Sequence, residues 1–127
     1  MRIILLDIQS QLYAKAIQRI LTQDIGGDNV VIVKTPEETA DLCRIMQPYA
    51  VLMEVTGYSP WLLSDRLNTC RWVRHSAKAC KLVLIVDDNV DRKLAEQVKD
   101  AKKNGLIDAF LFSSTTDSYL AAVVDSL

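Results

Sequence analysis

The chain has 127 residues, half of them hydrophobic, and its 15 Lys plus Arg against 16 Asp plus Glu give a formal charge of -1. This length predicts one domain over residues 1–127, built around a single packed core. The near balance of charge excludes an overall field that would draw the domain to nucleic acid or to an anionic membrane. We therefore expect no direct nucleic-acid binding and no membrane binding by this domain.

The cysteines and the N-terminal residues indicate the compartment. The three cysteines form no C-x-x-C pair and there is one histidine, which argues against a disulfide framework or a zinc site and favours a reducing cytoplasm. The apolar residues before Asp7 are too few for a signal-peptide core, and no run approaches the ~20 apolar residues of a membrane span. We expect a cytoplasmic protein.

The chain begins with an alternation of short apolar runs and amphipathic segments. Residues 3–6 predict a first strand, apolar on both faces as buried parallel strands are. Residues 10–23 carry apolar side chains at helical spacing, and Gly26-Gly27 provides a stop. Residues 30–33 predict the second strand. These segments give the first βαβ unit of the predicted fold.

The next segments repeat this order. TPEE predicts the start of a second helix, with Thr35 as the cap, Pro36 in the first turn and two glutamates at the positive helix end. Residues 50–55 predict the third strand, and residues 60–75 predict the third helix. The apolar residues of that helix recur at helical spacing and are Leu63, Leu67 and Cys70.

The last segments follow the same rule. Residues 82–86 and 107–112 predict the fourth and fifth strands, and Asn104-Gly105 is a natural stop for the helix between them. That fourth helix is indicated by a stripe of Val90, Leu94, Val98 and Ala101. The fifth helix is indicated by a stripe of Leu120, Val123, Val124 and Leu127.

This βαβαβαβαβα order predicts an α/β fold, a doubly wound five-stranded parallel sheet of the flavodoxin-like type with strand order 2-1-3-4-5. Ligands of such sheets bind outside the carboxyl ends of the strands. The chain places Asp7, Glu54, Asp87 and Asp88 there, with Ser113 after the last strand. Converging carboxylates suit Mg²⁺, so Asp7, Glu54 and Asp87 are candidate metal ligands. Alternatively, these acids only cap helices or face water.

At this point the sequence resembles the receiver domains of two-component response regulators over nearly its whole length. RIILLD is similar to the family's first strand, YAVLMEV to the third strand, LNTCRWVRHSAKACKLVLIV to the third helix and fourth strand, and IDAFLF to the fifth strand. The resemblance implies a CheY-like domain that is a signalling module and not an enzyme.

The departures from the family pattern are specific. Receivers have two adjacent acids after the first strand, whereas Asp7 is followed by an isoleucine. Glu54 stands at the phosphoacceptor position, with Asp7 as the alternative. The switch hydroxyl falls at Val86 or Asp87, neither of which is a hydroxyl residue. The family's lysine falls at Ser113, or at Phe112 without an inserted residue, and we prefer Ser113 because that register places Phe110 at the switch aromatic.

Phosphoryl transfer needs an acceptor carboxylate, a divalent metal and a cation on the phosphoryl oxygens. Because the acceptor is changed and the lysine is missing, we expect a degenerate receiver, or pseudo-receiver, that acts through protein contacts to control an output such as transcription. The expected partners are a histidine kinase or an output domain. The family also implies a homodimer through the fourth helix, the fifth strand and the fifth helix.

Two other interpretations stay open from the sequence. In a circularly permuted receiver, LVLIVDDN would be the first strand, Asp7 the acceptor and Thr35 the switch hydroxyl, and residues 3–6 would lie beside residues 82–86. A flavodoxin-like metal or small-molecule binder, or an enzyme subunit, would use the acidic crevice. The basic residues near Trp72 favour a solvated helix face over a nucleic-acid site; they are Arg66, Arg71, Arg74, Lys78 and Lys81.

Overall fold

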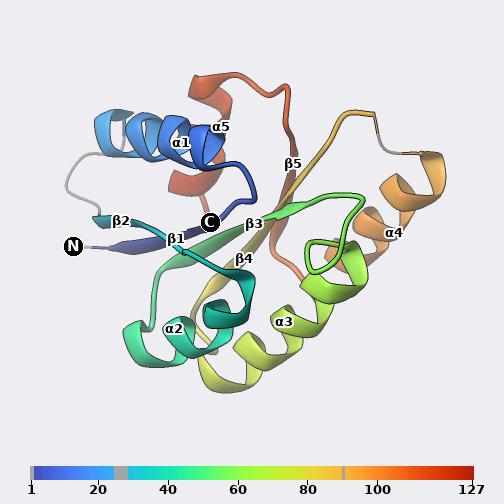
Figure 1. Ribbon diagram of the computed structural model, residues 1–127, viewed down its shortest axis with the longest axis horizontal. Coiled ribbons are helices and arrows are strands. Elements are labelled where there is room, and N and C mark those ends of the chain that lie inside the picture. Colours follow the sequence, from blue (N-terminus) through green and yellow to red (C-terminus); the bar gives the residue numbers. More distant parts are fainter. Residues whose placement is uncertain (1, 25–28, 90) are drawn as a thin grey trace.

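Strands and helices alternate along the whole chain (Figure 1). The computed structural model describes residues 2–24, 29–89 and 91–127. The elements, in chain order, are β1 (Ile3–Asp7), α1 (Gln11–Asp24), β2 (Asn29–Ile32), the 3-10 turn η1 (Pro36–Glu38), α2 (Thr39–Met46), β3 (Ala50–Val55), α3 (Leu63–Ser76), β4 (Lys81–Val86), α4 (Arg92–Lys103), β5 (Ala109–Phe112) and α5 (Asp117–Asp125).

The five strands form one parallel sheet in the order β2-β1-β3-β4-β5. Leu5 in β1 is the register partner of Val31 in β2 on one side and of Val51 in β3 on the other. The predicted flavodoxin-like strand order is therefore confirmed. The permuted interpretation is wrong, because β1 pairs with β3, and β4 lies between β3 and β5.

Helices cover both faces of this sheet. Helices α1 and α5 lie together on one side, and α2, α3 and α4 lie on the other (Figure 1). Successive side chains of a strand point to opposite faces. Accordingly, Leu5 packs in the core cluster that contains Cys43 and Val73, whereas Leu6 packs in the cluster that contains Ile17 and Leu120. Asp7 has the parity of Leu5, which directs it toward α2 and α3.

The second helix begins differently from the prediction. The Thr35 side chain makes no capping hydrogen bond. Instead, the Glu38 N–H donates to the Thr35 carbonyl at 3.1 Å, which closes the single turn η1. Proline at the start of this turn has its backbone φ fixed near helical values, so a tight turn forms first and α2 begins only at Thr39.

Other boundaries differ by a few residues. Strand β5 begins at Ala109, two residues after the predicted start, because the Ile107 N–H is bonded to the Ala101 carbonyl at 3.4 Å in the turn that ends α4. Gly105, with φ +80°, ends that helix region as predicted. Asp91 caps α4 by accepting from the Leu94 N–H at 2.8 Å. The predictions made for Gly26-Gly27 and Val90 lie outside the described residues.

Within residues 2–24, 29–89 and 91–127, every helix is too short or too polar to cross a lipid bilayer.

Candidate functional site

The carboxyl ends of the strands hold the predicted site residues, but in different environments. Asp7 is the last residue of β1 and is 2% exposed. Glu54, near the end of β3, is half-buried, and Asp87 and Ser113 are exposed just after β4 and β5. The sheet therefore separates one buried carboxylate from the acids that face solvent.

The buried carboxylate of Asp7 is paired with Arg66 of α3, which is 1% exposed. Nη1 of Arg66 donates to Oδ2 at 2.7 Å, and Nη2 donates to Oδ1 at 3.2 Å and to the Asp7 carbonyl at 3.0 Å. A guanidinium that binds both oxygens of one carboxylate forms a charge-assisted, geometrically specific pair. The pair joins β1 to α3 across 59 residues of sequence.

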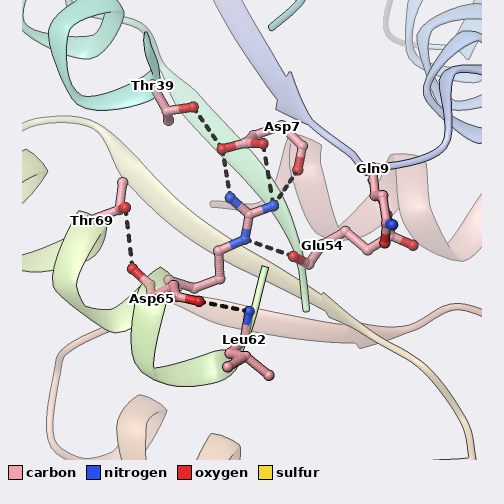
Figure 2. A network of polar contacts seen from close by, with 8 residues as sticks. Asp7, Gln9, Thr39, Glu54, Leu62, Asp65 and Thr69 are labelled. Carbon is pink, nitrogen blue, oxygen red and sulfur yellow. Dashed lines mark hydrogen bonds and ion pairs between the residues drawn. The ribbon is translucent and has the colours of Figure 1, made fainter. Parts of the chain in front are cut away.

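Thr39 completes the surroundings of this pair. Its hydroxyl, at the start of α2, donates to Oδ2 of Asp7 at 2.6 Å, and the residue is fully buried. Arg66 also contacts β3, because its Nε donates to the Glu54 carbonyl at 2.7 Å. Figure 2 shows the labelled residues Asp7 and Glu54 of this network, with Thr39 on the far side of the Asp7 carboxylate from Glu54. Four elements, β1, β3, α2 and α3, meet at this network.

The first turn of α3 delivers the arginine. The Leu62 N–H donates to the Asp65 carboxylate at 3.2 Å, which ties the start of the helix. An acid in a first turn is favoured by the helix dipole, whereas a cation there is disfavoured. Arg66 nevertheless lies in that turn, with its N–H bonded to the Leu62 carbonyl at 3.0 Å. Its position is thus explained by the buried partner Asp7 and not by the helix itself.

Glu54 faces a different space. Its Oε1 accepts from the Gln9 backbone N–H at 2.8 Å, so it fixes the chain between β1 and α1. Glu54 also lines a crevice of about 520 Å³ at the strand ends. Among the described residues, the lining contains carboxylates and no Lys, Arg or His; it consists of Gln9, Glu54, Val55, Thr56, Gly57, Tyr58, Asp87, Asn89, Asp91 and Leu94.

The Asp87-Asp88 pair organises the turns around this crevice. Oδ1 of Asp87 accepts from the Asn89 N–H at 2.8 Å, and Oδ1 of Asp88 accepts from the Ser114 N–H at 3.4 Å. Glu54 and Asp87 share the crevice, whereas Asp7 is turned toward Arg66. In the part of the chain that the structure describes, no three acidic, His or Cys side chains are grouped to hold a metal ion. The predicted set of three carboxylates is therefore not brought together.

The two remaining predicted positions lie on and after β5. Phe110 is half-buried, and its ring meets that of Phe112 edge-on at a centroid distance of 6.0 Å. The Lys102 ammonium lies 5.9 Å from the Phe110 ring centroid. Ser113 is exposed and its N–H donates to the Val86 carbonyl at 2.9 Å, which continues the ladder between β4 and β5.

The sequence interpretation missed Arg66. It was grouped with a solvated basic helix face, which is wrong for this residue because it is buried and paired. The interpretation holds for Arg71 and Lys78, which are exposed, and Trp72 is 67% exposed beside them. Arg74 is in part a structural residue, since it pairs with Asp108 at 2.9 Å. Arg66 lies in the first turn only because α3 begins at Leu63 and not at the predicted residue 60, so the predicted helix did not mark it as an unusual cation.

The three cysteines are free and buried, as expected of small core residues. Burial, which disfavours the thiolate, raises the pKa of Cys70 to about 12. The Cys70 thiol is therefore protonated at neutral pH and adds no nucleophile to the strand-end site.

Comparison with known proteins identifies the fold. No protein-family model and no curated protein matches the sequence. A DNA-binding response regulator of the LuxR family from Staphylococcus aureus has a TM-score of 0.78 at 11% identity, over 99% of this chain and 98% of that chain. A response regulator from Thermotoga maritima has a TM-score of 0.76 at 20% identity, over 99% and 96%. The REC domain of AraT, a response regulator from Geobacillus stearothermophilus, has a TM-score of 0.76 at 15% identity, over 98% and 91%. At such identities the likeness concerns architecture, and this chain has the receiver fold over nearly its whole length.

Proposed function

We propose that the chain is a receiver-like signalling domain of a response regulator, of the pseudo-receiver type, that controls an output through protein contacts and not through phosphorylation. Glu54 takes the phosphoacceptor position, and Asp87, Phe110 and Ser113 take the switch positions. The observation that carries the proposal is the strand-end crevice, whose described lining contains Glu54 and Asp87 but no cationic side chain. A phosphoryl group there would meet negative charge without compensation.

A phosphodonor assay tests the absence of phosphorylation. The chain is incubated with Mg²⁺ and a small-molecule phosphodonor, and the intact mass is measured over time, with an active receiver as the positive control. We expect no stable modification. Stable, metal-dependent phosphorylation of Glu54 or Asp7 would contradict the proposal. The matched variant Glu54→Asp shows whether the longer side chain alone prevents the reaction. If this variant is phosphorylated and the parent is not, the lack of phosphorylation in the parent is due to Glu54.

The contact surface we propose is formed by α4, β5 and α5. Phe112 and Tyr119 are 38% and 58% exposed on this surface. Exposed aromatic side chains are more typical of interfaces than of faces that only contact solvent. Aromatic side chains of this kind are frequent anchors of protein interfaces. The proposed partners are an output domain, a histidine kinase or a second copy of the chain.

Sedimentation velocity over a range of concentrations tests the homodimer. We expect concentration-dependent self-association that the double substitution Phe112→Ser and Tyr119→Ser weakens. Trp72→Ser is the control, because it removes an aromatic side chain that is 67% exposed on α3, outside this surface. A chain that sediments as a monomer at every concentration contradicts self-association through this face.

A further inference from the structure

Mg²⁺ does not fit the buried carboxylate of Asp7. Mg²⁺ takes oxygen ligands in octahedral geometry at about 2.0 to 2.1 Å. Both carboxylate oxygens of Asp7 already accept from Arg66, and Oδ2 also accepts from Thr39. A metal ion on Asp7 would have to displace a buried guanidinium, and Glu54 is directed instead to the Gln9 N–H.

We infer that Arg66 is an internal cation that takes the place of a divalent metal at this strand end. Its guanidinium donates hydrogen bonds to oxygens of the Asp7 carboxylate, the Asp7 carbonyl and the Glu54 carbonyl. Oxygen atoms of this kind are also the ligands that hold a magnesium ion. Unlike a metal, the guanidinium neither dissociates nor loses its charge at any physiological pH.

The consequence is a strand end held in one state. Arg66 joins the ends of β1 and β3 to the first turn of α3, and Thr39 adds the first turn of α2 through the same carboxylate. A metal-dependent site has a loaded and an empty form, but this network has one form only. The inference goes beyond the proposed function, because it concerns how the domain is held and can fail while phosphorylation remains absent.

Thermal unfolding of the full chain, measured in EDTA and in millimolar Mg²⁺, tests the inference with Arg66→Met, Asp7→Leu/Arg66→Met and Arg44→Met. The parent should unfold at the same temperature in both conditions. Arg66→Met leaves a buried, unpaired carboxylate and should lower the melting temperature by about 10 to 20 °C in EDTA. Because the vacated space is bordered by oxygens, Mg²⁺ should recover part of this loss. The double variant removes both charges and should recover most of it without metal.

Arg44→Met is the matched control, because Arg44 pairs with Asp41 at 3.8 Å on an exposed surface, where such a pair contributes little. Arg66→Lys serves if Arg66→Met does not fold; it keeps the charge without the planar fork of the guanidinium and should melt below the parent. Saturable stabilisation of the parent by Mg²⁺ that EDTA reverses would overturn the inference. So would an Arg66→Met or Arg66→Lys variant that is as stable as the parent, or an Arg66→Met variant that is destabilised but ignores Mg²⁺. Mg²⁺ binding by the parent without phosphorylation would overturn this inference alone and leave the proposed function standing.

Discussion

The hydroxyl of Thr39 donates a 2.6 Å hydrogen bond to the Asp7 carboxylate from 32 residues away, and both residues are buried. This contact ties the first turn of α2 to the end of β1. The Asp7 carboxylate thus accepts hydrogen bonds from both Thr39 and Arg66. The first position of α2 is thus defined by a tertiary contact with an ionised group.

Thr39→Val should therefore destabilise the domain. Valine has nearly the shape of threonine but cannot donate, so the carboxylate loses one hydrogen bond and keeps its burial. Hydrogen bonds to charged groups contribute about 1.5 to 3 kcal/mol, which is the expected loss in the free energy of unfolding. Urea denaturation checks it. Thr22→Val is the control, because that hydroxyl donates to the Gln18 carbonyl on the exposed side of α1, and a change below about 0.5 kcal/mol is expected there. Equal effects of the two substitutions would contradict the role of Thr39.

Asp108 offers a second test, at the opposite end of the sheet. Its Oδ2 accepts from Arg74 at 2.9 Å and from the Leu82 N–H at 2.8 Å. Asp108→Asn keeps an acceptor for Leu82 but loses the ion pair, which is partly exposed, so the expected cost is about 0.5 to 1 kcal/mol. Asp108→Ala also leaves the Leu82 N–H without this acceptor and should cost about 1 to 3 kcal/mol.

Denaturation of these variants at low and high salt separates the two contributions. Only the ion-pair part should weaken with salt. Asp125→Asn is the reference for an exposed carboxylate that also contacts an arginine, Arg2, at 3.4 Å, and it should change stability by less than about 0.5 kcal/mol. If the alanine variant of Asp108 were no less stable than the asparagine variant, the proposed role of the Leu82 contact would be wrong.

Gly105 is required for its backbone conformation. A side-chain carbon added there would have nothing within 4 Å, yet its φ of +80° is one that L residues rarely adopt. Gly105→Ala should therefore destabilise by about 1 to 2 kcal/mol through backbone strain alone. Gly57→Ala is a close control, since a carbon there also has nothing within 4 Å and no left-handed φ is involved. It should be neutral or slightly stabilising. Loss of stability in both variants by the same amount would rule out strain at Gly105 as the cause.

The strands could be predicted because they depend on local patterns, and their order because a βα alternation has one usual solution. Each strand is a short, continuous apolar run, and the alternation with helices leaves few topologies. Gly105 marked its turn for the same local reason. The strand-end acids were also found, since their position follows from where the runs end. Local pattern was therefore sufficient for the frame of the site.

The partners of those acids could not be predicted in the same way. Arg66 lies on a helix among other basic residues, and only its burial and its contact with Asp7 at the end of β1 show that it points inward. The Thr39 contact depends on where α2 starts, and that start was displaced by the turn at Pro36. Asp7, Glu54 and Asp87 all stand at strand ends, but this shared position does not show which face of the sheet each side chain points to. Each of these features depends on tertiary packing and not on the local sequence.

Tyr13 gives the last prediction, through its titration. Its pKa is raised above the usual 10, first by burial, which disfavours the phenolate, and then by the negative charges of Glu54 and Asp88. The folded chain thus keeps this proton to higher pH than the unfolded chain does. Below pH 10 both states are protonated and Tyr13 adds no pH dependence. Above pH 10 the unfolded state loses its proton first, so stability falls as the pH rises through this range.

The difference in unfolding free energy between the parent and Tyr13→Phe should accordingly be constant below pH 10 and shift in favour of the phenylalanine variant above it. Taking the difference cancels the similar alkaline contribution of Cys70. Glu54→Gln should lower the Tyr13 pKa toward 10, because the second cause of the shift is removed. Tyrosinate absorbance, taken as the parent minus the Tyr13→Phe titration, measures this directly, with Asp41→Asn as a control for the loss of a carboxylate on α2. A Tyr13 pKa that responds equally to the Glu54 and Asp41 substitutions would show that it does not sense the strand-end charge, whereas a response to Glu54 alone makes it a reporter of that crevice.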